Sequence, residues 1–469
     1  MVLGFNCMPQ QKKNRPTIWQ PSRRDVLRLG GLGGLGLTWP QLLQARDQAT
    51  GNNGATFGRA KRVIMLFLHG GHPQQETFDP KPNGPAEVRG EFGAIATSIP
   101  GVQYSELIPR LAQAADRWTV IRSMSHGNTN HVQACLPAQT GHKHPKALRS
   151  RGDFPPSETD FPPVGAVLDH LRPNQSGLPT WVRIGPLMRR SNGTTLHGQT
   201  PGFLGKQHAS FAVDQNLLAD DVQIKALHSP DDLTTIRLTD RHQLRQQFNQ
   251  LSQQLDQAAG KQSLDGYYSR AVNLLASAKT REAFALSKEP KKVRERYGKT
   301  EFGQRCLLAR RLVESGVPMV NVSYCHTPSG SWDTHSQNFT KMKDSLAPDL
   351  DTAATALMED LDQRGMLDDT LLVINAEFGR TPKINSKAGR DHWPFVYSLA
   401  MVGAGVQPGA IYGASDKSAA YPASTPHDPA DMAATFYHLL GVPADTRIYD
   451  SLRRPHALVI GSPIKALLA

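Results

Sequence analysis

Continuous apolar runs of strand length recur along most of the chain. They cover residues 62–71, 118–125, 180–185, 317–324, 370–379, 397–405 and 456–461. Consecutive rather than alternating apolar positions are typical of strands that are covered on both faces. Helical patterns occupy residues 301–315, 342–363 and 430–440. Strands that alternate with helices predict an α/β fold with a mostly parallel central sheet and helices on both faces.

One long segment, residues 232–300, departs from this alternation. It is polar and rich in glutamine, and its pattern is helical, as in DRHQLRQQFNQLSQQLDQ. We interpret it as a helical insertion packed on the side of the sheet. We assign the α/β domain to residues 61–469 and a linker to residues 46–60.

The first 45 residues have the pattern of an export signal. Arg23 and Arg24 precede an apolar segment, residues 29–39, that is too short to span a bilayer. The arrangement resembles a twin-arginine signal, which delivers folded and often metal-loaded proteins across the inner membrane. It predicts a periplasmic or secreted protein that meets the twin-arginine translocase during export. No stable membrane span is expected in the mature chain.

Charge and cysteine content narrow the function classes. The net charge is +12, of which residues 1–45 contribute +5, and the remaining +7 is spread thinly. This argues against nucleic-acid binding and allows mild attraction to anionic substrates. Three cysteines in the mature chain, without a C-x-x-C pair, argue against a disulfide scaffold and a thiolate zinc site. A G-x-G-x-x-G match at residues 31–36 follows no strand, so no dinucleotide site is expected.

Histidines gather in the loops that follow four of the predicted strands. Nine of the 17 histidines lie in these loops, together with several acidic residues. The carboxyl ends of parallel strands meet at one edge of a sheet, where ligands usually bind. A single histidine is more often the partner of a backbone group, but imidazoles and carboxylates together suit zinc, manganese or iron. The loops therefore predict a metal or phosphoryl-type site at this edge.

Four motifs carry a family resemblance, in the order GGHPQQETFDPKP, WDTH, EFGRTP and GRDHW. They resemble a secreted bacterial family, domain of unknown function 1501, which is often described as sulfatase-like. The resemblance covers about residues 60–465. The segment around EFGRTP also resembles, more loosely, the region before the metal motif of the alkaline phosphatase superfamily. An alkaline-phosphatase-like fold is therefore expected.

The resemblance implies a divalent metal site, with zinc, manganese or calcium as candidates. The matching positions are His69, Asp333, His335, Glu377, Asp391 and His392. By this resemblance, Asp333, His335 and His392 form one complete metal position, whereas a second position keeps only His69 and Glu377. Glu377 keeps a carboxylate of the superfamily's Asp-His-Gly motif, whereas Phe378 replaces its histidine. Asp391 is either a ligand or the acceptor that orients a ligand histidine.

The sulfatase nucleophile has no counterpart in this chain. Residues 135–139, CLPAQ, lack the serine and arginine of the C-x-P-S-R motif, so formylglycine chemistry is not expected. Alignment on Thr140-Gly141 places His131 at the nucleophile position, with Thr129 two residues before it. Both a phosphohistidine intermediate and attack by metal-activated water agree with this pattern.

Two function classes agree with these residues. The first is an exported metal-dependent hydrolase of phosphate or sulfate esters, acting on a small anionic ester or a sulfated or phosphorylated glycan. Arg122 and Arg380 would clamp the anionic group, unless they form structural ion pairs. The second is a non-catalytic alkaline-phosphatase-like protein that binds a glycan or a protein partner. The histidine cluster favours the hydrolase, which we expect, and the lost nucleophile favours the binding protein.

Overall fold

The computed structural model describes residues 54–144, 153–222, 224, 227, 277–325 and 331–469. The described part from Thr56 onward forms one compact unit. The predicted export signal, most of the linker and residues 232–276 of the predicted insertion lie outside the described residues. In the described part, no helix is long and apolar enough to cross a membrane.

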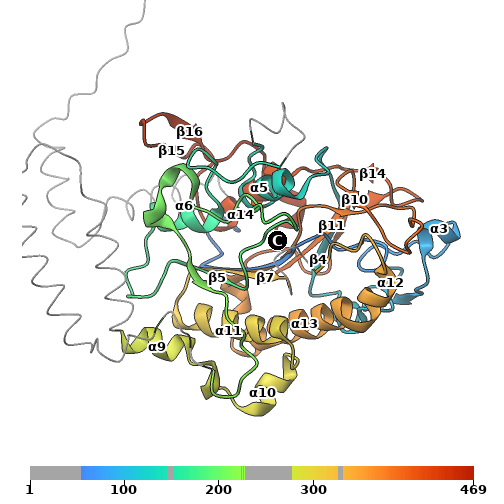
Figure 1. Ribbon diagram of the computed structural model, residues 1–469, viewed down its shortest axis with the longest axis horizontal. Coiled ribbons are helices and arrows are strands. Elements are labelled where there is room, and N and C mark those ends of the chain that lie inside the picture. The colour runs from blue at the N-terminus through green and yellow to red at the C-terminus, as the bar shows by residue number, and fades with distance from the viewer. Residues whose placement is uncertain (1–53, 145–152, 223, 225–226, 228–276, 326–330) are drawn as a thin grey trace, which may run out of the picture. The chain divides into compact units, whose positions relative to one another are not determined.

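An eight-stranded sheet forms the centre of the fold (Figure 1). Its spatial order is β12 (Ile411–Tyr412), β4 (Thr119–Met124), β11 (Tyr397–Val402), β8 (Thr370–Asn375), β1 (Arg62–Leu68), β7 (Met319–Tyr324), β5 (Trp181–Ile184) and β6 (Phe211–Val213). Strand β11 runs antiparallel to both of its neighbours, and every other pair is parallel. The predicted mostly parallel sheet is confirmed.

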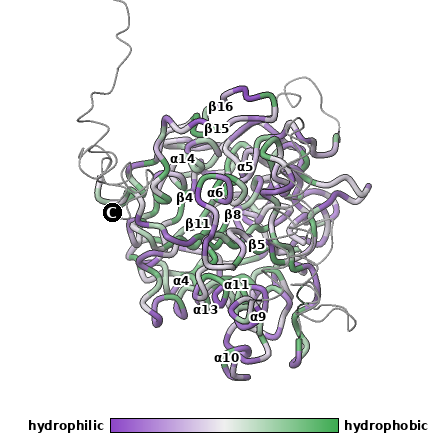
Figure 2. Tube along the Cα trace, turned by 90° about the vertical axis from the view of Figure 1, so that its left-hand side faces the viewer, coloured by the Kyte–Doolittle hydropathy of each residue, from purple (hydrophilic) through white to green (hydrophobic). Residues whose placement is uncertain are grey.

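The side chains of the central strand β1 enter two different cores. Ile64 and Leu66 belong to one core, whereas Met65 and Phe67 belong to the other. Both faces of the strand are buried, which explains its unbroken apolar sequence. Figure 2 shows the same arrangement, with the sheet between two helical layers.

Helices cover both faces of the sheet, as predicted (Figure 1). One layer contains α4 (Pro109–Gln113), α9 (Ala278–Phe284), α10 (Lys291–Arg296), α11 (Glu301–Ser315) and α13 (Ala347–Gln363), as Figure 2 also shows. The other contains α5 (His131–Thr140), α6 (Val164–Leu171) and α14 (Pro429–Leu439). A π-helical turn, Met342–Leu346, precedes α13, so the two together fill the predicted helix at 342–363.

Two short α-helices and four small ribbons accompany these elements, besides several 3-10 turns. They are α3 (Ala86–Arg89), α12 (Asn338–Lys341) and four two-stranded ribbons: β2 (Ala94–Ala96) with β3 (Gln103–Ser105), β9 (Gly379–Arg380) with β10 (His392–Trp393), β13 (Ala414–Ser415) with β14 (Pro422–Ser424), and β15 (Arg447–Tyr449) with β16 (Pro455–Ala457).

The strand predicted at residues 456–461 is wrong. Only β16 forms there, and it pairs with β15 outside the central sheet. Leu458 is nevertheless buried in the second core. The apolar run therefore reflects packing against the helices rather than a place in the sheet.

Candidate metal centre

The centre lies where β1, β7 and β8 end. The parallel register pairs Phe67 with Asn375. His69 lies two residues after Phe67, and Glu377 lies two residues after Asn375. Both side chains are buried. The two residues lie together because the carboxyl ends of neighbouring parallel strands are at the same edge of the sheet.

Two glycines allow other segments to approach this edge. Gly70 has a φ of 110°, and a Cβ atom there would lie 2.2 Å from the backbone nitrogen of Asp333. Gly71 has a φ of 85°, and a Cβ atom there would lie 2.4 Å from the backbone oxygen of Phe378. Any side chain would push these segments away, so the Gly-Gly turn sets the position of Asp333.

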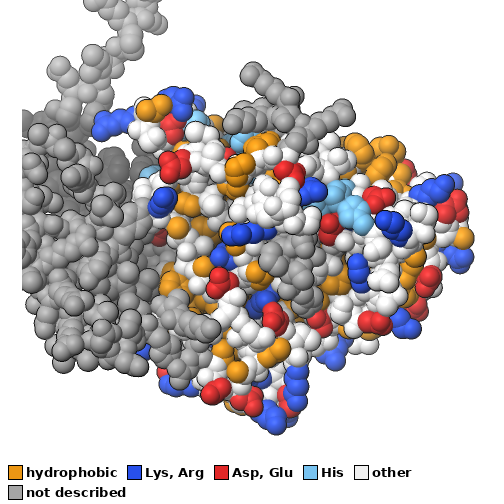
Figure 3. All heavy atoms as spheres, in the orientation of Figure 1, with side chains coloured by type: hydrophobic (Ala, Val, Ile, Leu, Met, Phe, Trp, Pro, Cys, Tyr) orange, Lys and Arg blue, Asp and Glu red, His pale blue; other side chains and the backbone are white. Residues whose placement is uncertain are grey.

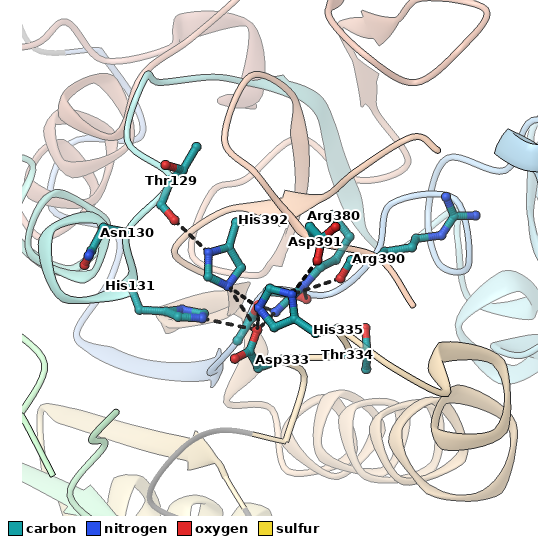
Figure 4. A network of polar contacts seen from close by, with 12 residues as sticks. Thr129, Asn130, His131, Asp333, Thr334, His335, Arg380, Arg390, Asp391 and His392 are labelled. Carbon is teal, nitrogen blue, oxygen red and sulfur yellow. Dashed lines mark hydrogen bonds and ion pairs between the residues drawn. The ribbon is translucent and has the colours of Figure 1, made fainter. Parts of the chain in front are cut away.

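Asp333 is the hub of the cluster (Figure 4). Its Oδ1 atom lies 3.3 Å from Nε2 of His131 and 3.1 Å from Nε2 of both His335 and His392. The two Nε2 atoms of His335 and His392 are 2.9 Å apart. Arg380 donates to the same Oδ1 atom over 2.6 Å.

Each of the three histidines turns its other ring nitrogen toward an oxygen acceptor. The Nδ1 atom of His131 lies 2.6 Å from Oε1 of Glu377. The Nδ1 atoms of the other two histidines face Oδ1 of Asp391, at 2.6 Å, and the backbone oxygen of Thr129, at 2.7 Å. All three Nδ1 atoms therefore contact oxygen, and all three Nε2 atoms point at Asp333.

The segment before α5 positions His131. The side chain of Asn130 caps the helix by accepting a hydrogen bond of 2.8 Å from the backbone nitrogen of Val132. His131 is consequently fixed as the first helical residue, and its ring lies 4.8 Å from the ring of Phe378. The apolar ring closes one side of the imidazole.

Electrostatics keep the two carboxylates charged. Burial alone would raise the pKa of Asp333, but hydrogen bonds from the three histidines and the charge of Arg380 hold it far below its ordinary value. Burial opposes ionisation of Glu377 in the same way, and the hydrogen bond from His131 lowers its pKa. The two negative charges therefore favour the binding of a cation at this centre.

The histidines of the centre fall into two groups by pKa. Burial lowers the pKa of His69 and His392 to about 4, so both rings are neutral at physiological pH. Burial also opposes charge on His131, but hydrogen bonds to Asp333 and Glu377 outweigh it and raise the pKa of the ring.

A protein-family model identifies the family to which the chain belongs. The model described as "Protein of unknown function (DUF1501)" matches residues 60–468. The chain belongs to the DUF1501 family. The family resemblance seen in the sequence motifs is confirmed, and these motifs supply the turn at Gly70, the hub Asp333, and the segments that carry Glu377 and His392.

Solved structures similar to this DUF1501 chain come from the sulfatases and the alkaline phosphatase superfamily. An alkaline phosphatase superfamily protein from Vibrio parahaemolyticus is 15% identical, with a TM-score of 0.41 and coverage of 89% of this chain and 72% of that one. The PsFucS1 sulfatase from Pseudoalteromonas sp. is 14% identical (TM-score 0.39, coverage 92% and 76%), and a phosphonate monoester hydrolase from Silicibacter pomeroyi is 10% identical (TM-score 0.39, coverage 87% and 76%). These values are too low to transfer an activity. No curated protein matches the sequence.

The structure brings most of the residues singled out in the sequence into one place. Asp333, His335 and His392 touch one another, and His131 joins them. Only the backbone oxygen of Thr129 takes part, through His392.

Both arginines form ion pairs within the protein, which is one of the two alternatives expected for them. Arg122 donates to the backbone oxygen of Gln103 over 2.9 Å and pairs with Asp79 at 3.6 Å, so its described contacts lie away from the cluster. Arg380 reaches the cluster, but it is buried and its guanidinium already bonds Asp333 and three backbone oxygens. Both guanidinium groups therefore already have protein partners.

Two supporting residues were missed in the sequence. Arg390 is buried and donates to Glu76 over 3.0 Å, which ties the GRDHW segment to the ETFDPKP segment. The Asn385 side chain donates to the backbone oxygen of His335 over 3.0 Å. Both residues lie within or next to the quoted motifs, but nothing in a single sequence indicates that a buried ion pair joins two of them.

Proposed function

We propose that the protein is a metal-dependent hydrolase of phosphate or sulfate esters. The observation that carries this proposal is the orientation of three histidines around Asp333. His131, His335 and His392 each direct Nδ1 to an oxygen acceptor and Nε2 to the same carboxylate oxygen. Metal-ligating histidines show this arrangement, in which the outer N–H bond fixes the tautomer and the ring.

The alternative explanation for this orientation is three protonated rings. A neutral imidazole that donates from Nδ1 has an unshared electron pair on Nε2, which would face the negative oxygen of Asp333. Three protonated rings would remove this conflict, but they would place three positive charges beside the buried Arg380. A single divalent cation bound by the three electron pairs and the carboxylate satisfies every contact.

One ligand atom from each of His131, Asp333 and His392 lies within 4.8 Å of the other two, which agrees with a shared ion. Metal–ligand bonds of about 2.0 to 2.1 Å give ligand separations of roughly 3.3 to 3.4 Å in a tetrahedron. The separations from Asp333 Oδ1 are 3.1 to 3.3 Å, and His335 and His392 are 2.9 Å apart. These four separations differ from the tetrahedral value by only a few tenths of an ångström.

The residues around the ligands have separate tasks in this proposal. Glu377 and Asp391 orient two of the rings, and Arg380 keeps Asp333 ionised. When bound, a divalent ion would polarise an ester oxygen and make water a stronger nucleophile at neutral pH. Since both nitrogens of His131 face carboxylates, we assign that residue to the ligand set and the attack on the ester to water.

Access to the centre exists on one side. His335 exposes 45% of its side chain, whereas His131 exposes 4%. The space-filling view shows histidine side chains at the surface between charged residues (Figure 3). An ester would therefore reach the centre past His335.

One observation favours the binding-protein alternative. Four protein ligands fill the coordination shell of a tetrahedral zinc ion, and closed sites of that kind are structural. Manganese prefers six ligands and would keep open positions in the same cluster. The identity of the ion therefore separates the two functions.

The proposal is tested by turnover of aryl phosphates and aryl sulfates. Purified mature protein should hydrolyse one of the two classes, lose activity with a chelator, and recover it with manganese. His392→Ala should reduce turnover by at least about a hundredfold, because a ligand to the ion is lost. His170→Ala, which changes an exposed histidine on α6, should keep wild-type activity.

Two other outcomes would contradict the proposal. If the metal-loaded wild type turns over no member of a broad panel of phosphate and sulfate esters, the hydrolase is excluded and the binding protein remains. Activity that survives complete metal removal would exclude metal dependence.

A further inference from the structure

A second group of two histidines and one carboxylate lies outside the centre described above. It consists of His144, Asp160 and His197, all buried. The Nε2 atom of His144 is 3.2 Å from Oδ1 of Asp160, and Nδ1 of His197 makes a short contact with Oδ2. One atom from each of the three residues lies within 4.8 Å of the others.

The outer nitrogen of His197 has a backbone partner. Its Nε2 atom lies 3.0 Å from the backbone oxygen of Phe154. Both ring nitrogens thus face oxygen acceptors, and a neutral imidazole can donate to only one of them. A cation held by Nδ1 removes the conflict, because the ring then stays neutral and donates from Nε2 to Phe154.

We infer that His144, Asp160 and His197 form a second metal site, specific for zinc or a similar divalent transition metal. Two imidazoles and one carboxylate are ligands that zinc accepts, with one position left for water or for the second carboxylate oxygen. The contact of 3.2 Å between His144 and Asp160 is close to the ligand separation of a tetrahedral site, roughly 3.3 Å. Because all three ligands are buried, we assign this site a structural role, with the second carboxylate oxygen as the fourth ligand.

The second site lies at the opposite end of α5 from the first. Helix α5 begins at His131 and ends at Thr140, so its ten residues are about 15 Å long. His144 follows the end of this helix, whereas Asp160 and His197 belong to two other loops. An ion there would join three separate segments of the chain.

One of these loops also reaches the first centre. Asp153 accepts hydrogen bonds of 2.9 Å from Asn130, which caps α5, and of 3.0 Å from Asn192. The loop that carries Asp160 therefore contacts the start of α5, and the ion would hold its other end. We expect the second site to stabilise the helix that presents His131.

The test is a metal count and a cobalt spectrum on the full mature chain. In a His392→Ala background, which disables the first centre, the metal-free protein should still bind one equivalent of Zn²⁺. Co²⁺ should give the intense visible bands of a tetrahedral nitrogen and oxygen site. Adding His197→Ala should abolish both. His456→Ala is the matched control, because His456 also pairs with an aspartate, Asp450, at 3.1 Å but belongs to no group of three ligands in the described chain.

Asp160→Asn provides a second route if the alanine variant does not fold. The side chain keeps its shape and loses its charge, so zinc binding should fall while the circular dichroism spectrum is unchanged. Two results in the His392→Ala background would overturn the inference. In the first, the protein binds one equivalent of Zn²⁺ both with and without His197→Ala. In the second, neither protein binds Zn²⁺. Equal losses in the His197 and His456 variants would also overturn it, because the effect would then belong to histidine removal in general.

Discussion

At the scale of single residues, the orientation of the histidines depends on acceptors that a sequence does not identify. The motifs indicated Asp333, His335 and His392, because acids and histidines were grouped in them. Alignment on Thr140-Gly141 indicated His131, but at the position of a nucleophile. Its proposed use as a ligand is based on the contact between its Nδ1 atom and Glu377, which are 246 positions apart in the chain. The direction of the Arg122 side chain likewise depends on contacts with distant parts of the chain.

A substitution at Asp391 tests the proposed ligand set without removing a ligand. Its side chain is 51% exposed and bonds Nδ1 of His335. Asp391→Asn should weaken metal binding by about tenfold to a hundredfold without loss of the fold. Isothermal titration of the metal-free protein measures this. Asp368→Asn, on an exposed turn before β8 and so at the opposite edge of the sheet, should leave the affinity unchanged. Equal affinities in all three proteins would contradict the orienting role of Asp391.

The turn at Gly70 is expected to be intolerant of any side chain. Gly70→Ala would combine a positive φ with a contact of 2.2 Å to Asp333, and should cost more than about 2 kcal/mol in the free energy of unfolding. Gly193→Ala has a similar φ, 86°, and no atom within 4 Å of the added Cβ, so it should cost only about 1 kcal/mol. Denaturant unfolding compares the two. Equal losses would show that backbone strain alone matters at Gly70.

At the scale of elements, the sequence predicted the buried centre of the sheet better than its edges. Six of the seven predicted strands are in the sheet, because strands with two covered faces have long apolar runs. The edge strands β6 and β12 were missed since they have only three and two residues. The antiparallel direction of β11 was also not predicted, because an apolar run carries no information on strand direction.

Helix α13 carries two buried aspartates with opposite pKa shifts. Burial raises the pKa of Asp351 to about 6, although it accepts hydrogen bonds from two backbone nitrogens of α4. Ionisation of this group therefore costs stability, which is fully present below pH 4 and is lost as the pH rises through about 6. Asp351→Asn loses one of the two backbone hydrogen bonds at every pH, because its amide nitrogen cannot accept. Relative to the wild type, its free energy of unfolding should nevertheless rise by up to about 3 kcal/mol between pH 4 and pH 7.

Asp360 on the same helix provides the control. Burial would raise its pKa, but hydrogen bonds from Tyr297 and Arg364 lower it. Its charge therefore contributes stability above the unfolded pKa, and that contribution is lost as the pH falls. Relative to the wild type, the free energy of unfolding of Asp360→Asn should fall between pH 4 and pH 7, the reverse of Asp351→Asn. Unfolding curves from pH 4 to 8 measure both. The same sign of this change for the two variants would contradict the assigned environments.

At the scale of the whole molecule, the proposed activity and the proposed location depend on different parts of the chain. The described part from Thr56 onward holds the candidate centre, whereas the paired arginines that predict export lie in the first 45 residues. We propose that Arg23→Lys combined with Arg24→Lys leaves the precursor in the cytoplasm. Fractionation of cells that express both forms measures this. Normal processing and export of the double variant would exclude the twin-arginine route.

The centre around Asp333 is the central claim, and anomalous diffraction from crystals of the metal-loaded protein tests it most directly. Data at the zinc or manganese absorption edge should show a peak about 2.0 to 2.2 Å from Oδ1 of Asp333 and from Nε2 of His131, His335 and His392. The three Nδ1 contacts should be unchanged. Absence of a peak there at saturating metal, with the rings bonded directly to Asp333, would contradict the metal centre and the function proposed from it.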